Sequence, residues 1–162
     1  MQTKKFTSSS SKETKDFGKA LARAIRKEGP KPSPIVFALE GMLGSGKTTF
    51  VQGFLSGFGV RKRVQSPTFV VIRRYRLPAK KDPHFKNVFH MDAYRLKAAS
   101  KKDGRHLGPI GFWSMLEEPG NIVFVEWPER LKGVLPRNAR WIAFSHGAKE
   151  NERIITTRHR TA

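Results

Sequence analysis

Residues 41–48 read Gly41-Met-Leu-Gly44-Ser45-Gly46-Lys47-Thr48, and they follow the apolar run Ile35-Val-Phe-Ala-Leu39 after a single glutamate. This is the pattern G-x-x-x-x-G-K-[ST] of a loop that cradles phosphates, because its glycines let the backbone bend until successive N–H groups point inward. In such a loop the lysine reaches the β and γ oxygens of a triphosphate, and the next hydroxyl binds Mg²⁺. The apolar run predicts a strand before the loop, and residues 50–55 predict an amphipathic helix after it. The stretch therefore predicts a strand, a phosphate-binding loop and a helix whose N-terminus attracts anions.

The remaining apolar segments predict an α/β fold. Residues 14–27 carry apolar side chains at helical spacing, with Thr14 as the expected N-cap. Strands are predicted at 66–72, 87–92 and 122–126, and the segments 141–144 and 153–156 resemble a closing antiparallel pair. This is more strand than a regular βαβ alternation supplies. We therefore expect a P-loop NTPase-type mixed sheet, mostly parallel with antiparallel additions, flanked by helices.

The length and composition predict one domain. The chain has 162 residues, of which 38% are hydrophobic, so one core is adequately supplied. We expect a disordered basic leader over residues 1–13, a single P-loop ATPase domain over 14–157 and a basic tail over 158–162. The chain has no cysteine, which excludes disulfides and thiolate catalysis, and no apolar run near 18 residues, which argues against a transmembrane helix. A cytoplasmic protein without membrane association is expected.

The formal net charge of +19 is extreme for a nucleotide-binding domain. Such a field attracts polyanions, so weak electrostatic contact with RNA is one interpretation and a solvated surface that meets an acidic protein is the other. The cations cluster at 61–63, 73–76, 80–81, 101–102 and 158–160.

Phosphoryl transfer needs more than a cradle, and three residues are candidates for the rest. Glu126 closes the hydrophobic run 122–125, where P-loop proteins place an acid that organises the metal. Asp92 ends another predicted strand and could hold Mg²⁺ or position the nucleophile. Thr68 follows Pro67 and could sense a γ-phosphate as part of a switch segment. Each of the three also has a structural interpretation. Glu126 could be a carboxylate at a strand end, Asp92 could start a turn, and Thr68 could lie in a turn at the start of a strand.

Four motifs in this order resemble the TsaE family, formerly YjeE, the ATPase component of bacterial tRNA threonylcarbamoyladenosine synthesis. They are the loop 41–49, Ser66-Pro67-Thr68-Phe69, His90-Met-Asp92-Ala-Tyr94-Arg95-Leu96 and Val125-Glu126-Trp127-Pro128-Glu129-Arg130. The resemblance implies that ATP and Mg²⁺ are cofactors. It implies that the chain supports a TsaD–TsaB synthase, which forms N6-threonylcarbamoyladenosine at position 37 of tRNAs reading ANN codons, and that its ATPase activity is weak alone.

The resemblance also assigns roles to residues. Lys47, Asp92 and Glu126 become the catalytic set, and Thr48, Glu126 and Asp92 the residues associated with the metal. Trp127 becomes an aromatic residue near the nucleotide, and Thr14 lies where the base is expected. The expected ATP-binding residues are Thr14, Gly41, Gly44, Ser45, Gly46, Lys47, Thr48, Thr49, Thr68 and Trp127.

Three other classes of protein share parts of this pattern. A P-loop small-molecule kinase fits the loop and the size, but it gives no role to the segments at 66–69 and 126–130. A GTPase would need an Asn-Lys-x-Asp segment, which does not follow the loop. An RNA-associated binding protein in which ATP is incidental is favoured by the charge alone.

Overall fold

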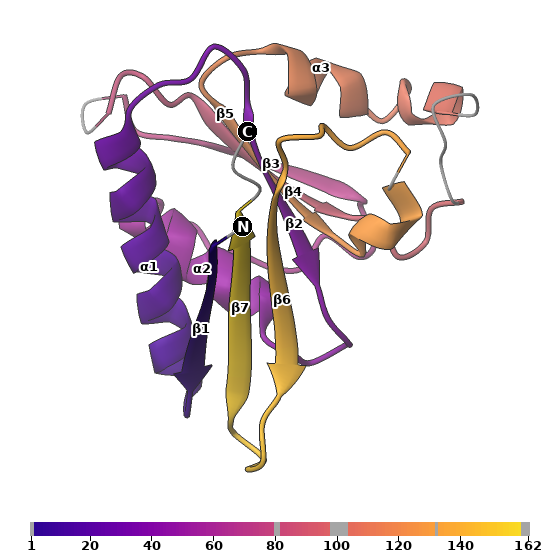
Figure 1. Ribbon diagram of the computed structural model, residues 1–162. Coiled ribbons are helices and arrows are strands. Elements are labelled where there is room, and N and C mark those ends of the chain that lie inside the picture. Colours follow the sequence, from indigo (N-terminus) through magenta and orange to yellow (C-terminus); the bar gives the residue numbers. More distant parts are fainter. Residues whose placement is uncertain (1, 80–81, 98–103, 132, 160–162) are drawn as a thin grey trace.

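The computed structural model describes residues 2–79, 82–97, 104–131 and 133–159, and its centre is one mixed sheet (Figure 1). Within these residues the strand order is β1-β7-β6-β2-β5-β4-β3. Neighbouring strands β6, β2, β5 and β4 run parallel, and β7, β1 and β3 join by antiparallel pairing. The strands are β1 (Gln2–Ser8), β2 (Ile35–Glu40), β3 (Ile72–Arg76), β4 (Asn87–Asp92), β5 (Asn121–Glu126), β6 (Arg140–His146) and β7 (Arg153–His159). The expected P-loop α/β class, with a mixed sheet, is confirmed.

Helices cover both faces of this sheet and divide the core into two layers. The helices α1 (Ser11–Glu28) and α2 (Lys47–Gly57) pack on one face, while α3 (Phe112–Glu117) lies on the other (Figure 1). The central strands β2 and β5 supply both layers, because alternate side chains of a strand point to opposite faces. Phe37 and Phe124 stack in the first layer with ring centroids 4.9 Å apart, and Val36 and Val123 belong to the second. None of the described helices combines the length and apolar character that crossing a bilayer requires.

Small residues let α1 and α2 approach closely, which fixes the helix that carries the loop. A Cβ atom on Gly53 of α2 would lie 2.0 Å from the carbonyl oxygen of Lys15 in α1. A Cβ atom on Gly18 of α1 would lie 2.3 Å from the carbonyl oxygen of Phe50 in α2. Real Cβ atoms do not come this near to backbone, so each glycine is needed for the contact between the helices.

We expect Gly53→Ala to lower the free energy of unfolding by about 1–3 kcal/mol, because the added methyl group forces the two helices apart. Urea denaturation followed by circular dichroism measures this change. Ser56→Ala is the matched control, since Ser56 is exposed on the same helix and its substitution adds no atom at the interface. Equal stability of the two variants would contradict the close packing.

The N-terminal prediction is wrong for the described residues. In place of a disordered leader, Gln2–Ser8 forms β1, whose backbone pairs antiparallel with β7 along its whole length. Helix α1 then begins before Thr14, with Ser10 as the N-cap whose side chain accepts from the Glu13 N–H. The polar composition of β1 is similar to that of a disordered segment. The strand forms all the same, because an edge strand is held by backbone pairing and needs few apolar side chains.

Two further boundaries differ from the predictions. The strand expected at 66–72 begins only at Ile72, because the N–H groups of Val70 and Val71 both bond the carbonyl of Pro67 in a tight turn. The basic tail expected at 158–162 begins inside β7, and residues 160–162 lie outside the described part. The closing antiparallel pair is confirmed as β6 and β7.

Candidate functional site

The glycine-rich loop joins the end of β2 to the start of α2. Gly46 is the N-cap of α2 in a left-handed conformation, with φ of 100°, and no side chain caps the helix. Gly41 has φ of 144°, and a Cβ atom there would lie 2.5 Å from the carbonyl oxygen of Phe144 in β6. The first N–H groups of a helix have no partner within it, so here they remain available as donors for an anion. The Ser45 hydroxyl is also buried in this loop without a partner among the described residues.

Lys47 lies inside the loop with its side chain 4% exposed. Its Nζ donates to the carbonyl oxygens of Gly41 at 2.8 Å and of Met42 at 3.0 Å. The same atom lies 3.9 Å from Glu126 Oε2 and 5.1 Å from the ring centroid of Trp127. Burial lowers the pKa of Lys47 below its ordinary value, against the attraction of nearby carboxylates. The ammonium is therefore held at the centre of the loop by two carbonyls, an acid and an aromatic face.

Glu126 connects the loop to the neighbouring strands. Its Oε1 accepts a hydrogen bond from Thr48 Oγ1 at 3.0 Å and lies 2.7 Å from His90 Nε2. The His90 Nδ1 has no partner among the described residues, and an N–H on Nε2 can donate a hydrogen bond to the Glu126 carboxylate. Burial raises the pKa of the Glu126 carboxyl, but His90, Lys47 and Thr48 together hold it below its ordinary value. A buried carboxylate ion thus fixes the hydroxyl of Thr48.

Asp92 lies beside Glu126 because β4 and β5 run parallel and pair the two residues in register. Its Oδ2 accepts from Thr68 Oγ1 at 2.7 Å, and its Oδ1 accepts from the Tyr94 N–H at 3.0 Å. Thr68 Oγ1 also lies 2.7 Å from Ser66 Oγ. The end of β4 is therefore tied directly to the Ser66–Thr68 segment, which is the predicted switch.

Two hollows flank the loop. One of about 240 Å³ lies on the side of Asp92, and its lining includes Leu43, Gly44, Ser45, Gly46, Lys47, Thr48, Thr49, Ser66, Thr68, Asp92, Glu126 and Trp127. The other, of about 330 Å³, is lined by Ser9, Ser10, Ser11, Thr14, Gly44, Gly46, Thr49, Asn151 and Arg153. Gly44, Gly46 and Thr49 line both, so the loop separates two adjoining spaces.

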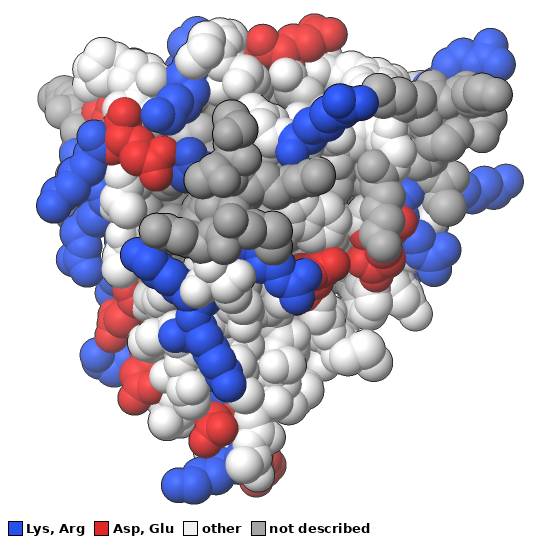
Figure 2. All heavy atoms as spheres, viewed as in Figure 1, with Lys and Arg blue, Asp and Glu red and all other residues white. Residues whose placement is uncertain are grey.

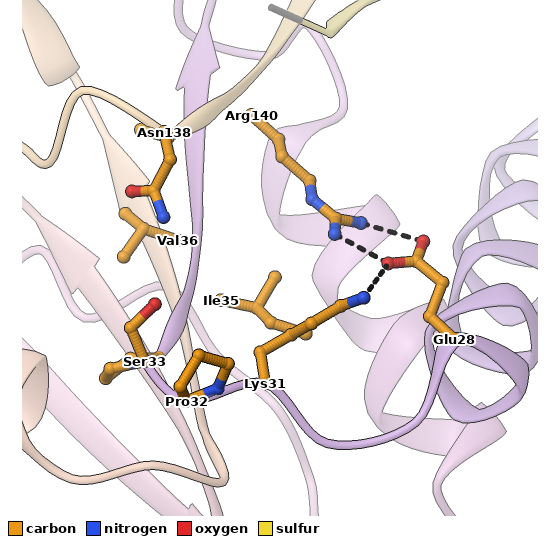
Figure 3. A pocket seen from close by; sticks show the side chains of 10 residues that line it. Glu28, Lys31, Pro32, Ser33, Ile35, Val36, Asn138 and Arg140 are labelled. Carbon is orange, nitrogen blue, oxygen red and sulfur yellow. Dashed lines mark hydrogen bonds and ion pairs between the residues drawn. The ribbon is translucent and has the colours of Figure 1, made fainter. Parts of the chain in front are cut away.

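A larger hollow of about 550 Å³ lies away from these residues, at the opposite ends of β2 and β6 (Figure 3). There Arg140 donates to both carboxylate oxygens of Glu28, at 3.0 and 2.6 Å, and Lys31 lies 3.9 Å from the same carboxylate (Figure 3). The pair of Arg140 and Glu28 joins β6 to α1. The polar side chains of the predicted site therefore gather at the loop and not at this larger hollow.

The structure brings most of the predicted site residues together. All the predicted site residues except Thr14 and Gly41 line the first hollow. Gly41 does not line it, but its carbonyl oxygen accepts a hydrogen bond from Lys47. Thr14 lies in the second hollow, where its hydroxyl is 2.8 Å from Ser8 Oγ.

Two residues of the site were missed by the sequence analysis. The sequence gives His90 no role beyond its place in a motif, but its contact with Glu126 makes it part of the site. Its position two residues before Asp92, and so on the same face of a strand, is a signal that could have found it. Arg153 Nε donates to the Gly44 carbonyl at 3.3 Å from β7, and no local pattern marks a residue 109 positions away from its partner.

The strand, glycine-rich loop and helix, with carboxylates at the ends of two adjacent parallel strands, define a P-loop α/β protein. Residues 8–155 match the model of the family described as threonylcarbamoyl adenosine biosynthesis protein TsaE. The chain therefore belongs to the TsaE family, whose members take part in threonylcarbamoyladenosine biosynthesis.

Individual relatives agree with this assignment. The TsaE protein of Synechocystis is 36% identical over 118 residues, which cover 73% of this chain and 66% of that protein. The TsaE protein of Bacillus subtilis is 33% identical over 159 residues, which cover 96% of this chain and 85% of that protein. The crystal structure of Bacillus subtilis YdiB aligns with a TM-score of 0.69 at 29% identity, over 96% of this chain and 84% of that chain.

Proposed function

We propose that this chain is a Mg²⁺-dependent ATPase that supports a TsaD–TsaB synthase in forming N6-threonylcarbamoyladenosine at position 37 of tRNAs reading ANN codons. One observation carries the proposal. Thr48 of the loop and Glu126 of β5, 78 residues apart, meet in a hydrogen bond of 3.0 Å, and both line the hollow of about 240 Å³. A structural loop has no need for a buried carboxylate at this point, whereas a metal-nucleotide site does.

The donors present fit a triphosphate with its metal. The loop N–H groups, the unpartnered Ser45 hydroxyl and the Lys47 ammonium supply hydrogen bonds for phosphate oxygens. Within the described residues no group of three or more histidine, cysteine or acidic side chains could hold a metal ion alone. This agrees with Mg²⁺, which usually binds through one or two protein ligands and shares its coordination with phosphates and waters. Bound Mg²⁺ would neutralise charge that develops on the phosphates.

Each polar side chain of the site then has a separate task. Thr48 offers a hydroxyl oxygen to the metal while its proton bonds Glu126, so the carboxylate orients the ligand. His90 is hydrogen-bonded to the same carboxylate oxygen as Thr48 and helps to hold it in place. Asp92 positions the attacking water, and its bond to Thr68 transmits the state of the phosphates to the Ser66–Thr68 segment. The second hollow, with Thr14 and Thr49, receives the nucleoside part of ATP.

The open side of the site explains why a partner is needed. Leu43 lines the first hollow, and Met42, Phe69 and Tyr94 lie within two residues of its lining residues in the sequence; all four side chains are more than half exposed. Exposed apolar side chains of this kind mark protein contacts. A synthase docked here would exclude water and complete the site, so hydrolysis by the chain alone should be slow.

A reconstituted reaction with TsaD, TsaB, the threonylcarbamoyl donor and unmodified tRNA tests this function. We expect many rounds of modification per synthase when the chain and ATP are present, and about one round when either is left out. The measurement is the amount of modified adenosine per synthase, determined by mass spectrometry of digested tRNA. Equal turnover with and without the chain would refute the proposed role.

A further inference from the structure

The basic residues of this chain are unevenly matched by acids along the sequence. From residue 41 to residue 81 there is no aspartate or glutamate. Apart from Lys47 of the loop, the described part of this interval carries six cations, which we call the β3 basic edge: Arg61, Lys62, Arg63, Arg73, Arg74 and Arg76.

These six residues lie at one border of the sheet. β3 is the last strand in the sheet order, and within the described residues it pairs with β4 on one side only. The segment that follows α2 lies beside β3, since the Tyr75 hydroxyl lies near the backbone of Gln65. The Ser66–Thr68 segment lies between the two groups of cations in the chain and contacts Asp92 of the nucleotide site.

The charges of the β3 basic edge are not neutralised by neighbours. In the described part of the chain none of the six forms an ion pair. On α1, by contrast, Lys12 and Lys19 both pair with Asp16. On the face drawn in Figure 2, acidic side chains lie among the more numerous basic ones. Positive potential is therefore less compensated at the β3 border than on α1.

The side chains of this surface suit phosphates. Five of the six are arginines, whose planar guanidinium binds phosphate oxygens through two parallel hydrogen bonds. Arg74 and Arg76 are exposed and two residues apart on one strand, so both point to the same face of the sheet. They line a hollow of about 400 Å³, in which the neighbouring Lys86 and Glu118 neutralise each other at 2.7 Å. The two arginines are thus left free for an anion.

Protein docking surfaces have a different composition, with apolar and aromatic residues at their centre. The exposed large apolar residues of the described chain lie on the loops around the nucleotide site and on α3, not within 61–63 or 73–76. We propose that the β3 basic edge binds the phosphate backbone of RNA, and, resting on the proposed function, that this RNA is the tRNA to be modified. Its contacts read charge and not base sequence, because backbone phosphates carry no sequence information directly.

The test is the affinity of the full chain for an unmodified tRNA, measured by fluorescence anisotropy across a range of salt concentrations. Arg74→Gln/Arg76→Gln removes two charges from the β3 basic edge. Lys4→Gln/Lys5→Gln is the matched control, because it removes two exposed charges from β1 at the opposite edge of the same sheet. We expect the first variant to bind tRNA at least about tenfold more weakly at 0.1 M salt and to lower the salt slope by about two, one for each lost contact. The control should stay within about twofold, and both variants should bind ATP as the unaltered chain does.

Three results would overturn the inference. Equal losses in both variants would show a general effect of net charge. Unaltered tRNA affinity in the arginine variant would show that these arginines do not bind RNA. Their role would then be to prevent another chain from pairing with the edge strand. Unaltered tRNA affinity together with weaker binding to TsaD–TsaB would make this a protein-docking surface. If instead the unaltered chain binds tRNA through these arginines but does not increase modification, the surface stands and the proposed function fails.

Discussion

Replacing Lys47 by alanine is expected to abolish measurable ATP binding, with an affinity loss of at least about a hundredfold. The ammonium is buried between two loop carbonyls, and in the ATP complex it would exchange these partners for β and γ phosphate oxygens. Hydrogen bonds to charged groups contribute about 1.5–3 kcal/mol each, so the loss of two accounts for at least a hundredfold. Isothermal titration calorimetry with ATP and Mg²⁺ measures the effect.

Two controls make this result interpretable. Lys86→Ala removes an exposed lysine whose partner is Glu118, and it should leave the affinity for ATP unchanged. Circular dichroism checks that the Lys47→Ala variant remains folded, since the substitution leaves the buried Glu126 without its nearby cation. A folded variant that still binds ATP tightly would disprove the assignment of the loop as the phosphate cradle.

Replacing Glu126 by glutamine is expected to lower the rate of ATP hydrolysis by at least about a hundredfold, a loss comparable to that of other groups that stabilise a transition state electrostatically. Glutamine has nearly the same shape, and its amide oxygen can still accept from Thr48. It lacks the negative charge that, in the proposed function, would organise the metal. His90, Lys47 and Thr48 maintain this charge by holding the pKa of the Glu126 carboxyl low against its burial. Phosphate release at saturating ATP and Mg²⁺, in the presence of TsaD–TsaB, measures the rate.

The affinity for ATP shows whether Glu126→Gln slows hydrolysis itself or only prevents ATP from binding. Measured with EDTA in place of Mg²⁺, it should change by no more than about threefold, because the loop and Lys47 are intact. Glu129→Gln is the control for charge, since Glu129 is exposed three residues further along the chain. Hydrolysis that proceeds at the original rate in Glu126→Gln would show that this acid does not serve the metal.

Several elements of the fold could be predicted because their signals are local. The loop 41–48 is recognisable from eight residues, since glycine at φ above zero and the lysine are needed at fixed spacing. Strands β2 and β5 are apolar throughout because both of their faces are covered. The motif order was sufficient to predict the family.

Other elements carried no such signal. β1 was mistaken for a disordered leader, because its partner β7 lies about 150 residues further along the chain and the pairing uses backbone groups. The 66–72 segment contains β-branched and aromatic residues suited to a strand. The Pro67 carbonyl, however, accepts hydrogen bonds from the N–H groups of Val70 and Val71, so β3 begins only at Ile72. Propensity was overridden in both cases by bonds that depend on the folded chain.

The sequence by itself determined that a glycine-rich loop of the P-loop pattern follows a buried strand and that two acids end two other strands, because these features depend on residue types at short spacing. The tertiary structure decided that Asp92 and Glu126 are neighbours, that His90 and Thr48 share one carboxylate oxygen and that Arg153 reaches the loop. These contacts join residues 34 to 109 positions apart. Parallel pairing brings the carboxyl ends of β2, β4 and β5 to one edge of the sheet, and antiparallel pairing with β6 brings the start of β7, with Arg153, to the same edge.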